Sequence, residues 1–483
     1  MSDQRTIFFI IGILLAAVAV GLLIPALIDA LAGHDEFRVF ITSALVTGFV
    51  SGLLILTNRG ELPPLSTKQA FILTGFSWLT LTSFAALPFA FGAMELSYTD
   101  AFFEAMSGLT TTGATIITDL DNAPPGILLW RALLQWFGGI GIIVMAISVL
   151  PMLNVGGMQL FRLESSDNSE KILPRTAQIA GSLMQLYFGI TIACALAYWV
   201  AGMPIFDAVA HAMTTIATGG FSTRNGSLGS FDAPAIELVA IIFMLASSLP
   251  FVAYLRAMND KVNALWQDSQ IRVFLAIALG AAFIMWLYQV PDMQMSDGAR
   301  RFLQSGFSTT SILSGTGYSV TDYNNWGPFA VALFFILTFI GGCAGSTACG
   351  LKIFRVQVVL KAGWRYIRQL VLPNGVFIIR YNGRVLEEEV ANSIIGFVAI
   401  FLITFAFTSL ALSLMGLDTL TALSASAAAI ANVGPGLGHV VGPSGNYASL
   451  PDAAKWTLAF GMMLGRLEFL SILVMLAPAF WRR

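Results

Sequence analysis

Four short stretches of this sequence join threonine, serine or asparagine to glycine in a pattern suited to binding a dehydrated cation. They read Thr-Thr-Gly-Ala-Thr, Thr-Gly-Gly-Phe-Ser, Gly-Thr-Gly-Tyr-Ser and Asn-Val-Gly-Pro-Gly, at residues 111–115, 218–222, 315–319 and 432–436. One glycine is common to all four, at Gly113, Gly220, Gly317 and Gly434. Glycine permits backbone dihedrals that turn carbonyl groups inward. Rings of carbonyl oxygens can replace the hydration shell of an alkali cation.

We therefore expect the four stretches to form one carbonyl-lined filter, with three consecutive residues from each. These residues are Thr111, Thr112, Gly113, Thr218, Gly219, Gly220, Gly315, Thr316, Gly317, Asn432, Val433 and Gly434. Because only the glycine is shared, the filter is a degenerate version of the TVGYG type and should hold fewer well-formed ion sites. This pattern favours potassium as the permeant ligand and leaves open a less selective monovalent cation channel.

A short helix is expected before each stretch, to hold it in place. A residue that caps helices well precedes the shared glycine by 13 positions in three stretches, at Asp100, Asp207 and Thr421. Gln304 holds that place in the third stretch and caps poorly, so we expect that helix to begin nearer Ser296 or Asp297. Each helix would direct its partially negative C-terminal end at the same point.

The composition places these elements in a membrane. Of the 483 residues, 57% are hydrophobic and only 11% are charged, whereas soluble domains carry roughly 25% charged residues. A span needs roughly 20 apolar residues, and ten runs approach or exceed that length: 7–31, 39–57, 71–91, 127–150, 179–200, 235–254, 273–290, 329–351, 394–415 and 456–480. We predict an all-α integral membrane protein with four tandem helix–pore-loop–helix repeats. The repeats should surround one pore in a pseudo-fourfold arrangement, preceded by an extra transmembrane helix pair.

The predicted organisation follows from the placing of these runs. The leading helix pair covers residues 1–66, and the four pore repeats cover 67–172, 173–268, 269–386 and 387–483, the third with a glycine-rich loop and a cytoplasmic segment. The first run is too long for a signal peptide, so we expect it to be retained. Most lysines and arginines fall on one side, among them Arg162, Lys171, Lys261 and Arg483. The positive-inside rule makes that side, with both termini, cytoplasmic.

A glycine-rich segment, residues 341–350, interrupts the eighth run. Each glycine costs roughly 1 kcal/mol relative to alanine in a helix, so a firm helix is not expected there. We predict a flexible intramembrane gate below the filter; a helix–helix contact through small residues is the alternative. The predicted gate residues are Gly342, Gly345, Ser346, Thr347, Gly350, Lys352 and Arg466. Lys352 can also be read as a lysine that reaches to the membrane interface.

Arg466 and Glu468 lie inside the last apolar run. A charge at membrane depth is costly and faces a cavity or a partner. Arg466 is therefore either an electrostatic barrier in the pore, near the glycine-rich loop, or part of a structural ion pair. Residues two positions apart point to different faces of a helix, so we do not expect Arg466 to pair with Glu468.

Four further polar residues lie near the first two stretches. Asp119 and Asp121 follow the first stretch and either concentrate cations at the outer mouth or are solvated loop residues. Glu104 and His211 lie on the short helices, where we expect them to make local structural hydrogen bonds.

Residues 354–390 form the largest predicted cytoplasmic segment, in which basic residues outnumber acidic ones. An Asn-Gly pair between apolar runs, at Asn382 and Gly383, predicts a β-hairpin. We expect this surface either to dock a cytoplasmic regulator or to contact lipid headgroups.

Other functional classes find little support. The three histidines belong to no metalloprotease motif, and no nucleophile-elbow or nucleotide-binding glycine motif occurs. We therefore expect no enzyme, no cofactor and no nucleic-acid partner. The three cysteines give no disulfide framework. A proton- or sodium-coupled potassium symporter remains the alternative, although such folds usually carry inverted repeats.

Together with residues 133–142, 341–352 and 465–469, the four stretches resemble the Trk/Ktr/HKT superfamily of cation transporters, and within it the membrane subunits of bacterial Trk potassium-uptake systems. The resemblance covers essentially the full length. It implies potassium uptake across the bacterial inner membrane, a homodimer with one pore per protomer, and a cytoplasmic nucleotide-binding regulator of the TrkA type. It also supports the barrier role of Arg466. Two departures are the missing Thr-Thr in the third stretch and Cys349, where relatives often have glycine.

Overall fold

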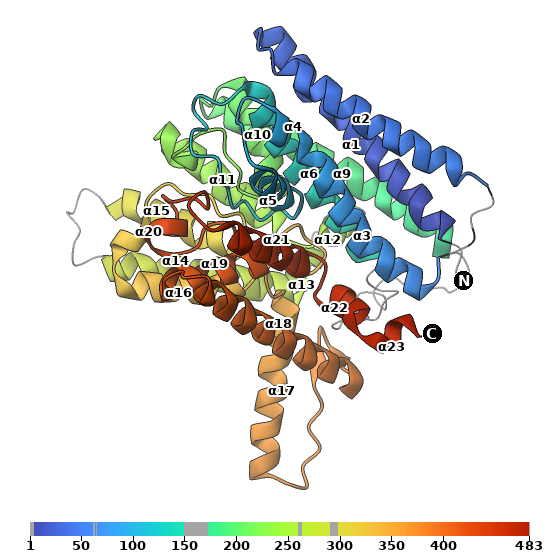
Figure 1. Ribbon diagram of the computed structural model, residues 1–483. Helices are drawn as coiled ribbons and strands as arrows, with labels where there is room; N and C mark the ends of the chain where they lie inside the picture. The colour runs from blue at the N-terminus through green and yellow to red at the C-terminus, as the bar shows by residue number, and fades with distance from the viewer. Residues whose placement is uncertain are drawn as a thin grey trace.

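The structure is a computed structural model that describes residues 4–60, 63, 65–148, 172–258, 263–289 and 298–482. It opens with two long helices, α1 (Arg5–Ala32) and α2 (Phe37–Thr57), which pack against each other (Figure 1). The turn between them begins at Gly33, whose φ of 76° suits glycine. The Ser51 hydroxyl donates to the carbonyl of Gly12 at 2.7 Å and ties the pair together.

The first two repeats follow the same order of long helix, short helix, loop and long helix. The first contains α3 (Thr67–Ala85), α4 (Leu87–Phe91), α5 (Tyr98–Leu109) and α6 (Pro125–Ser148). The second contains α9 (Ile172–Val200), α10 (Ile205–Ile216), the 3-10 turn η1 (Ser227–Phe231), α11 (Pro234–Ser247), α12 (Phe251–Met258) and α13 (Asn263–Gln267).

The last two repeats keep that order and add the hairpin. The third contains α14 (Ser269–Gln289), α15 (Gly298–Ser314), η4 (Tyr323–Trp326), α16 (Pro328–Phe339), α17 (Ile353–Val371), β1 (Arg380–Tyr381) and β2 (Arg384–Val385). The fourth contains α18 (Glu388–Leu414), α19 (Thr419–Ala431), α20 (Gly438–Val441), α21 (Asp452–Arg466), α22 (Leu470–Leu476) and α23 (Pro478–Trp481).

The short helices pack in a cyclic order that brings the four repeats together. Each packs on the first long helix of its own repeat: α5 on α3, α10 on α9, α15 on α14 and α19 on α18. Each also packs on the outgoing helix of the preceding repeat: α10 on α6, α15 on α11, α19 on α16 and α5 on α21. The last contact joins the fourth repeat to the first, so the arrangement closes on itself.

The long helices present apolar side chains outward, as a lipid-facing surface requires. Leu31, Val200 and Leu414 are examples, with exposed fractions of 77%, 81% and 89%. Exposed apolar surface on this scale marks an interaction surface and not a water-facing one. Seven helices among the described residues are long and apolar enough to cross a membrane, or nine if two bent pairs each count as one span. The chain is a multi-pass membrane protein.

Three of the ten predicted spans are not continuous helices. The chain bends by 89° between α11 and α12, where Pro250 interrupts the helix, and by 116° between α21 and α22. At the second bend Glu468 and Phe469 have φ of 62° and 34°, outside the helical region. The run 329–351 is helical only to Phe339. The last two residues of the run 127–150 lie outside the described part of the chain.

The predicted caps of α5, α10 and α19 are wrong by three residues. Ser97 and Asp418 cap α5 and α19 by accepting hydrogen bonds from the backbone N–H groups of Asp100 and Thr421, at 3.1 and 3.0 Å. Capping residues thus occur twice in these segments, and the earlier one is used. The helix α10 begins directly after Pro204. Asp207 therefore lies inside the helix and does not cap it.

Other predictions on residue placement have mixed outcomes. The helix α15 includes Gly298, close to its predicted start, but Ser296 and Asp297 lie outside the described residues. The same is true of Arg162, Lys171, Lys261 and Arg483, which entered the topology prediction.

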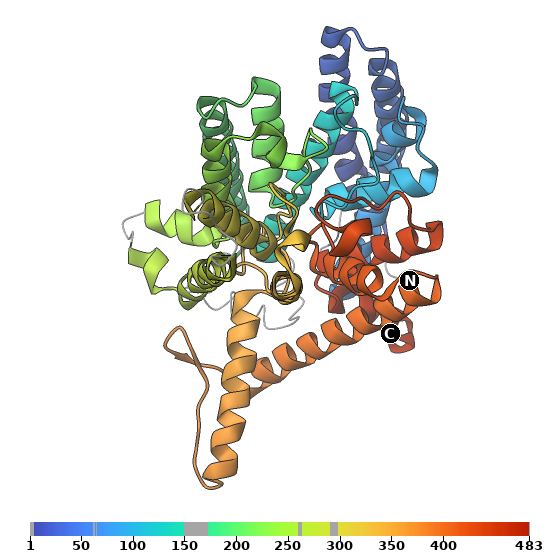
Figure 2. The same ribbon diagram turned by 90° about the vertical axis from the view of Figure 1, so that its left-hand side faces the viewer.

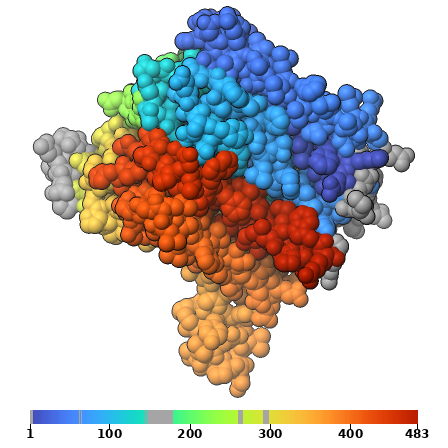
Figure 3. Space-filling view, viewed as in Figure 1, coloured from blue at the N-terminus to red at the C-terminus, as the bar shows by residue number. Residues whose placement is uncertain are grey.

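The predicted hairpin is confirmed. Strands β1 and β2 pair antiparallel, Arg380 with Val385 and Tyr381 with Arg384. Asn382 and Gly383 between them have φ of 47° and 81°, as a tight turn of this class requires. The hairpin accompanies α17, which projects from the helical body (Figures 1 and 2). The space-filling view shows this projection, in orange, standing clear of the rest of the molecule (Figure 3).

Candidate ion-conduction site

The four glycine stretches meet in a closed ring of equivalent contacts. A Cβ atom built on each shared glycine would crowd a carbonyl oxygen of the next stretch: Gly113 that of Gly219, Gly220 that of Thr316, Gly317 that of Val433, and Gly434 that of Thr112. The contacted residue is in every case the one that precedes the shared glycine. The four contacts are therefore equivalent, and at each one a carbonyl oxygen occupies the space that a side chain on the glycine would need.

The backbone conformations of the four stretches also correspond. The shared glycines Gly113, Gly220, Gly317 and Gly434 have φ of 85°, 77°, 78° and 89°. Two positions earlier, Thr111, Thr218, Gly315 and Asn432 have φ of 53°, 51°, 76° and 53°. Left-handed φ is uncommon for residues other than glycine and persists only where the surroundings enforce it. Positive φ at these two positions is thus a constraint common to all four stretches.

Backbone hydrogen bonds join each stretch to the end of its short helix. The pattern of these bonds in the third stretch differs from that in the others. The N–H groups of Thr112, Gly219 and Val433 donate to the carbonyl five residues earlier, at 2.9, 2.9 and 3.0 Å. In the third stretch Gly317 donates to Ser311 at 3.1 Å, and Thr316 donates to the Ser314 hydroxyl at 3.3 Å. The departure seen in its sequence therefore has a structural counterpart at the base of the loop.

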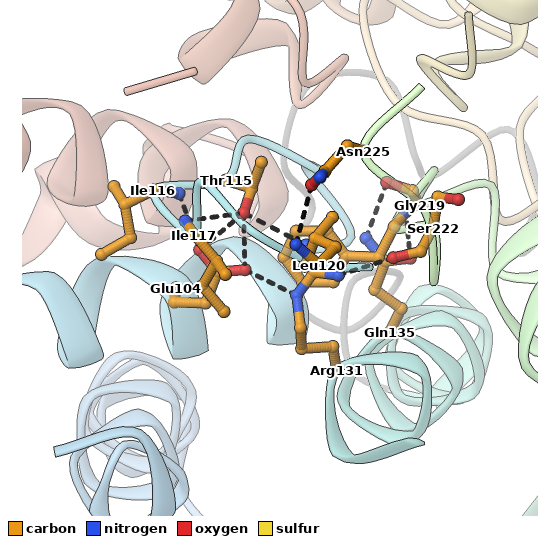
Figure 4. A network of polar contacts seen from close by, with 11 residues as sticks. Glu104, Thr115, Ile116, Ile117, Leu120, Arg131, Gln135, Gly219, Ser222 and Asn225 are labelled. Carbon is orange, nitrogen blue, oxygen red and sulfur yellow. Dashed lines mark hydrogen bonds and ion pairs between the residues drawn. The ribbon is translucent and has the colours of Figure 1, made fainter. Parts of the chain in front are cut away.

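Two side chains of α6 brace the first two stretches from behind (Figure 4). Arg131 forms an ion pair with Glu104, 2.7 Å from Nε to Oε1, and donates to the carbonyl of Ser222 at 2.7 Å. Gln135, one helical turn later, donates to the carbonyl of Gly219 at 2.6 Å and accepts from the N–H of Phe221 at 3.0 Å. These bonds link the first repeat to the second through fully buried groups.

Sequence reasoning assigned Arg131 and Gln135 no role. The signal that could have found Arg131 is its charge near the start of an apolar run, since such a charge needs a buried partner. Glu104 and His211 do make local hydrogen bonds, as predicted: Glu104 accepts from Ile116 at 2.9 Å, and His211 bonds the Ser222 hydroxyl at 2.9 Å. Glu104 also holds the ion pair, which the sequence did not reveal.

Polar side chains of the fourth repeat hold the other side of the ring. Asn432 donates to the Thr112 hydroxyl at 2.9 Å and to the carbonyl of Met462 at 2.8 Å. The Tyr447 hydroxyl donates to the carbonyl of Gly434 at 2.8 Å. The ring is thus closed by side-chain bonds as well as by close backbone contact.

The glycine-rich segment is not helical and lies directly against the ring. It folds back on itself, with Gly341 donating to the carbonyl of Leu351 at 2.8 Å. The Thr347 hydroxyl donates to the carbonyl of Ile216, at the end of α10, at 2.9 Å. Cys349 lies 3.5 Å from the Thr111 hydroxyl, between their Sγ and Oγ1 atoms. Because the segment is not a helix, a small-residue helix–helix contact does not explain its glycines.

Arg466 is buried and reaches the same segment. Its guanidinium donates to the carbonyl of Thr347 at 3.2 Å, to the Cys349 sulfur at 2.9 Å and to the carbonyl of Gly138 at 3.3 Å. Glu468 forms its ion pair with Arg355 instead. The expectation that Arg466 and Glu468 do not pair is confirmed.

A small cavity of about 30 Å³ lies beside this segment. Its lining includes Cys349, Lys352, Arg355, Asn432, Arg466 and Glu468. Lys352 donates to the carbonyl of Ala348 within the segment and so does not simply extend to the membrane surface. Positive side chains thus gather where the glycine-rich segment meets the fourth stretch.

On the other side of the ring, Asp119 and Asp121 are exposed. The Asn122 amide donates to Asp119 at 2.9 Å, and this hydrogen bond lowers the pKa of the Asp119 carboxyl. Asp119 therefore remains ionised at neutral pH, as a group that attracts cations must.

A buried ring of irregular loops surrounded by apolar helices is typical of a multi-pass membrane transport protein. The family model described as TrkH, cation transport protein, matches residues 35–483, and the chain belongs to this family. Its members are transporters and not enzymes.

Relatives match over almost the whole chain. The Trk system potassium uptake protein TrkI of Halomonas elongata is 43% identical, over 98% of this chain and 96% of its own length. The Trk system potassium uptake protein TrkH of Vibrio parahaemolyticus is 38% identical over 99% of both chains. The crystal structure of the potassium transporter TrkH from Vibrio parahaemolyticus is similar with a TM-score of 0.92, at 37% identity, and the match covers 99% of this chain and 100% of that one.

Proposed function

We propose that this chain takes up potassium across the bacterial inner membrane through a selectivity filter formed by the four glycine stretches. The observation that carries the proposal is the closed ring, in which each shared glycine crowds the carbonyl of the next stretch. Positive φ at alternate residues allows successive carbonyls to point toward the ring axis, where they replace water around a cation. The potassium uptake proteins of Halomonas and Vibrio, similar over their full length, support the choice of ion.

Reconstitution of the purified chain in liposomes tests this function. Under an imposed potential, we expect passive flux of potassium and rubidium to exceed that of sodium and lithium. A Gly113→Ala variant should lose this preference, because the added Cβ would displace the Gly219 carbonyl. Flux only in the presence of a proton or sodium gradient would instead establish a coupled symporter. Equal flux of all four ions would establish a less selective monovalent cation channel, and no flux in either format would contradict the proposal for the isolated chain.

The glycine-rich segment, in this proposal, gates the path below the filter. Its contacts with Ile216 and Thr111 support this role, because both residues lie at or just before the start of a stretch, on the side that we propose to be cytoplasmic. Gly345 has φ of 76° and no atom within 4 Å of its Cβ position. Glycine is therefore required here by the backbone conformation and not by close packing.

Arg466 should act as an electrostatic barrier at this gate. Replacing Arg466 with methionine is expected to raise basal potassium flux on the order of tenfold, because a nearby positive charge repels a permeant cation by several RT even when partly screened. The measurement is flux in liposomes, normalised to reconstituted protein. Arg466→Lys keeps the charge and should keep the low flux. Equal flux in the wild type and the methionine variant would leave Arg466 with a purely structural role.

The remaining assignments extend this proposal to the assembly. Both termini face the cytoplasm, the chain forms a homodimer with one pore per protomer, and residues 1–66 and the four repeats act as the units defined from the sequence. The exposed basic side chains of α17 and the hairpin, such as Arg368 and Arg380, dock a nucleotide-binding regulator of the TrkA type; a lipid headgroup contact is the alternative. Co-purification that survives detergent but is lost on charge reversal of these arginines distinguishes the two.

A further inference from the structure

The ring of carbonyl groups has one asymmetric member. The residues that precede the four shared glycines are Thr112, Gly219, Thr316 and Val433. Only the second lacks a side chain, and the Gln135 carboxamide occupies the vacant space. A Cβ atom built on Gly219 would overlap that carboxamide. A side chain from α6 thus stands behind the second stretch where the other stretches supply their own.

Gln135 is fully buried and uses both ends of its amide. Its Oε1 accepts from the N–H of Phe221 at 3.0 Å, and its Nε2 donates to the carbonyl of Gly219 at 2.6 Å. A backbone N–H can only donate, so the oxygen must face Phe221 and the NH₂ group must face Gly219. The orientation of the amide is therefore fixed by its partners. The Gly219 oxygen is the atom that Gly113 also approaches.

We propose that Gln135 is a specificity-determining residue of the filter, acting through the Gly219 carbonyl; this inference rests on the proposed function. The amide N–H draws electron density from one of four ring oxygens and holds that oxygen in place. An oxygen that already accepts a hydrogen bond exerts a weaker field on a cation. A weaker field penalises small ions more than large ones, because the Coulomb energy rises as the ion–oxygen distance falls. Gln135 therefore disfavours sodium relative to potassium.

The test compares two variants by the reversal potential under mixed potassium and sodium gradients. Gln135→Leu removes both hydrogen bonds at similar volume. Gln135→Glu keeps the acceptor for Phe221 but replaces the donor to Gly219 by a negative oxygen. Both should raise the sodium-to-potassium permeability ratio, the first by about fivefold, which corresponds to one hydrogen bond, and the second by more.

A matched control is Gln289→Leu. Gln289 is a buried glutamine of α14 that donates to the Ser305 hydroxyl at 2.9 Å, away from the ring contacts. Its replacement should leave the ratio unchanged. The reversal potential does not depend on the number of active molecules, so a partial loss of folded protein does not obscure the result.

The outcomes separate this inference from the proposed function. A wild-type chain without cation flux contradicts the proposed function itself. A selective wild type whose ratio stays the same in both Gln135 variants overturns only the role of Gln135. An equal rise in Gln289→Leu would show that the loss of any buried glutamine changes the ratio, and would overturn the role of Gln135 as well.

Discussion

Replacing Gly220 with alanine is expected to reduce potassium flux on the order of 100-fold and to abolish discrimination between potassium and sodium. The added Cβ would overlap the carbonyl oxygen of Thr316, and the φ of 77° is unfavourable for alanine. The dihedral costs about 1–2 kcal/mol and the overlap about 1–3 kcal/mol. Either the Thr316 carbonyl moves or the second stretch leaves its conformation. Flux and reversal potential in liposomes measure both effects.

Alanine variants of two other glycines separate the effect of the overlap from the effect of the unfavourable dihedral. Gly280, within α14, has no atom within 4 Å of its Cβ position, and its alanine variant should behave as the wild type. Gly383, in the hairpin turn, has φ of 81° but equally open surroundings. Gly383→Ala therefore carries the dihedral strain without the overlap and should reduce stability but not selectivity. A Gly220→Ala variant that keeps wild-type selectivity would contradict the ring of carbonyls as the selective element.

The second large effect concerns the Arg131–Glu104 ion pair. Glu104→Gln should lower the free energy of unfolding by about 3–5 kcal/mol, because it leaves a buried arginine charge without its partner. The two side chains have exposed fractions of 1% and 0%, so water cannot replace the lost carboxylate. Unfolding in detergent, followed by heat or denaturant, measures the change. We also expect weaker selectivity, since Arg131 holds the carbonyl of Ser222.

The pair Arg38–Asp35 provides the control, because its side chains have exposed fractions of 73% and 87%. Arg38→Ala should change the free energy of unfolding by only about 0–1 kcal/mol. A double variant, Glu104→Gln with Arg131→Met, should recover much of the loss by removing the unpaired charge as well. If Glu104→Gln were as mild as Arg38→Ala, the buried pair would not be what holds the second stretch.

The positions of the shared glycines were predictable because their requirement is local. A left-handed φ admits glycine in preference to other residues, so the sequence records the constraint directly at Gly113, Gly220, Gly317 and Gly434. The hairpin was predictable for the same reason, from Asn382 and Gly383. Long apolar runs likewise predicted the long helices, since the length of a span is set by the bilayer.

Features that depend on distant partners could not be predicted. The cap of α5 is Ser97 and not Asp100, and the aspartate pairs with Lys455, 355 positions away. The 116° bend after α21 depends on Glu468, which leaves the helical conformation and pairs with Arg355. The position of Gln135 follows from the missing side chain of Gly219, which lies 84 positions away in the chain.

The closure of the ring also constrains the order in which a working protein is made. Asn432 donates to Thr112 across 320 positions of the chain, so the first stretch leaves the ribosome long before its partner exists. Until the fourth repeat is inserted, the first three form an open arc, because a contact this distant cannot form early in folding. Translation that stops before Gly434 therefore yields a chain in which the ring of carbonyl groups cannot close. Synthesis of the last repeat is therefore the step that lets the ring close.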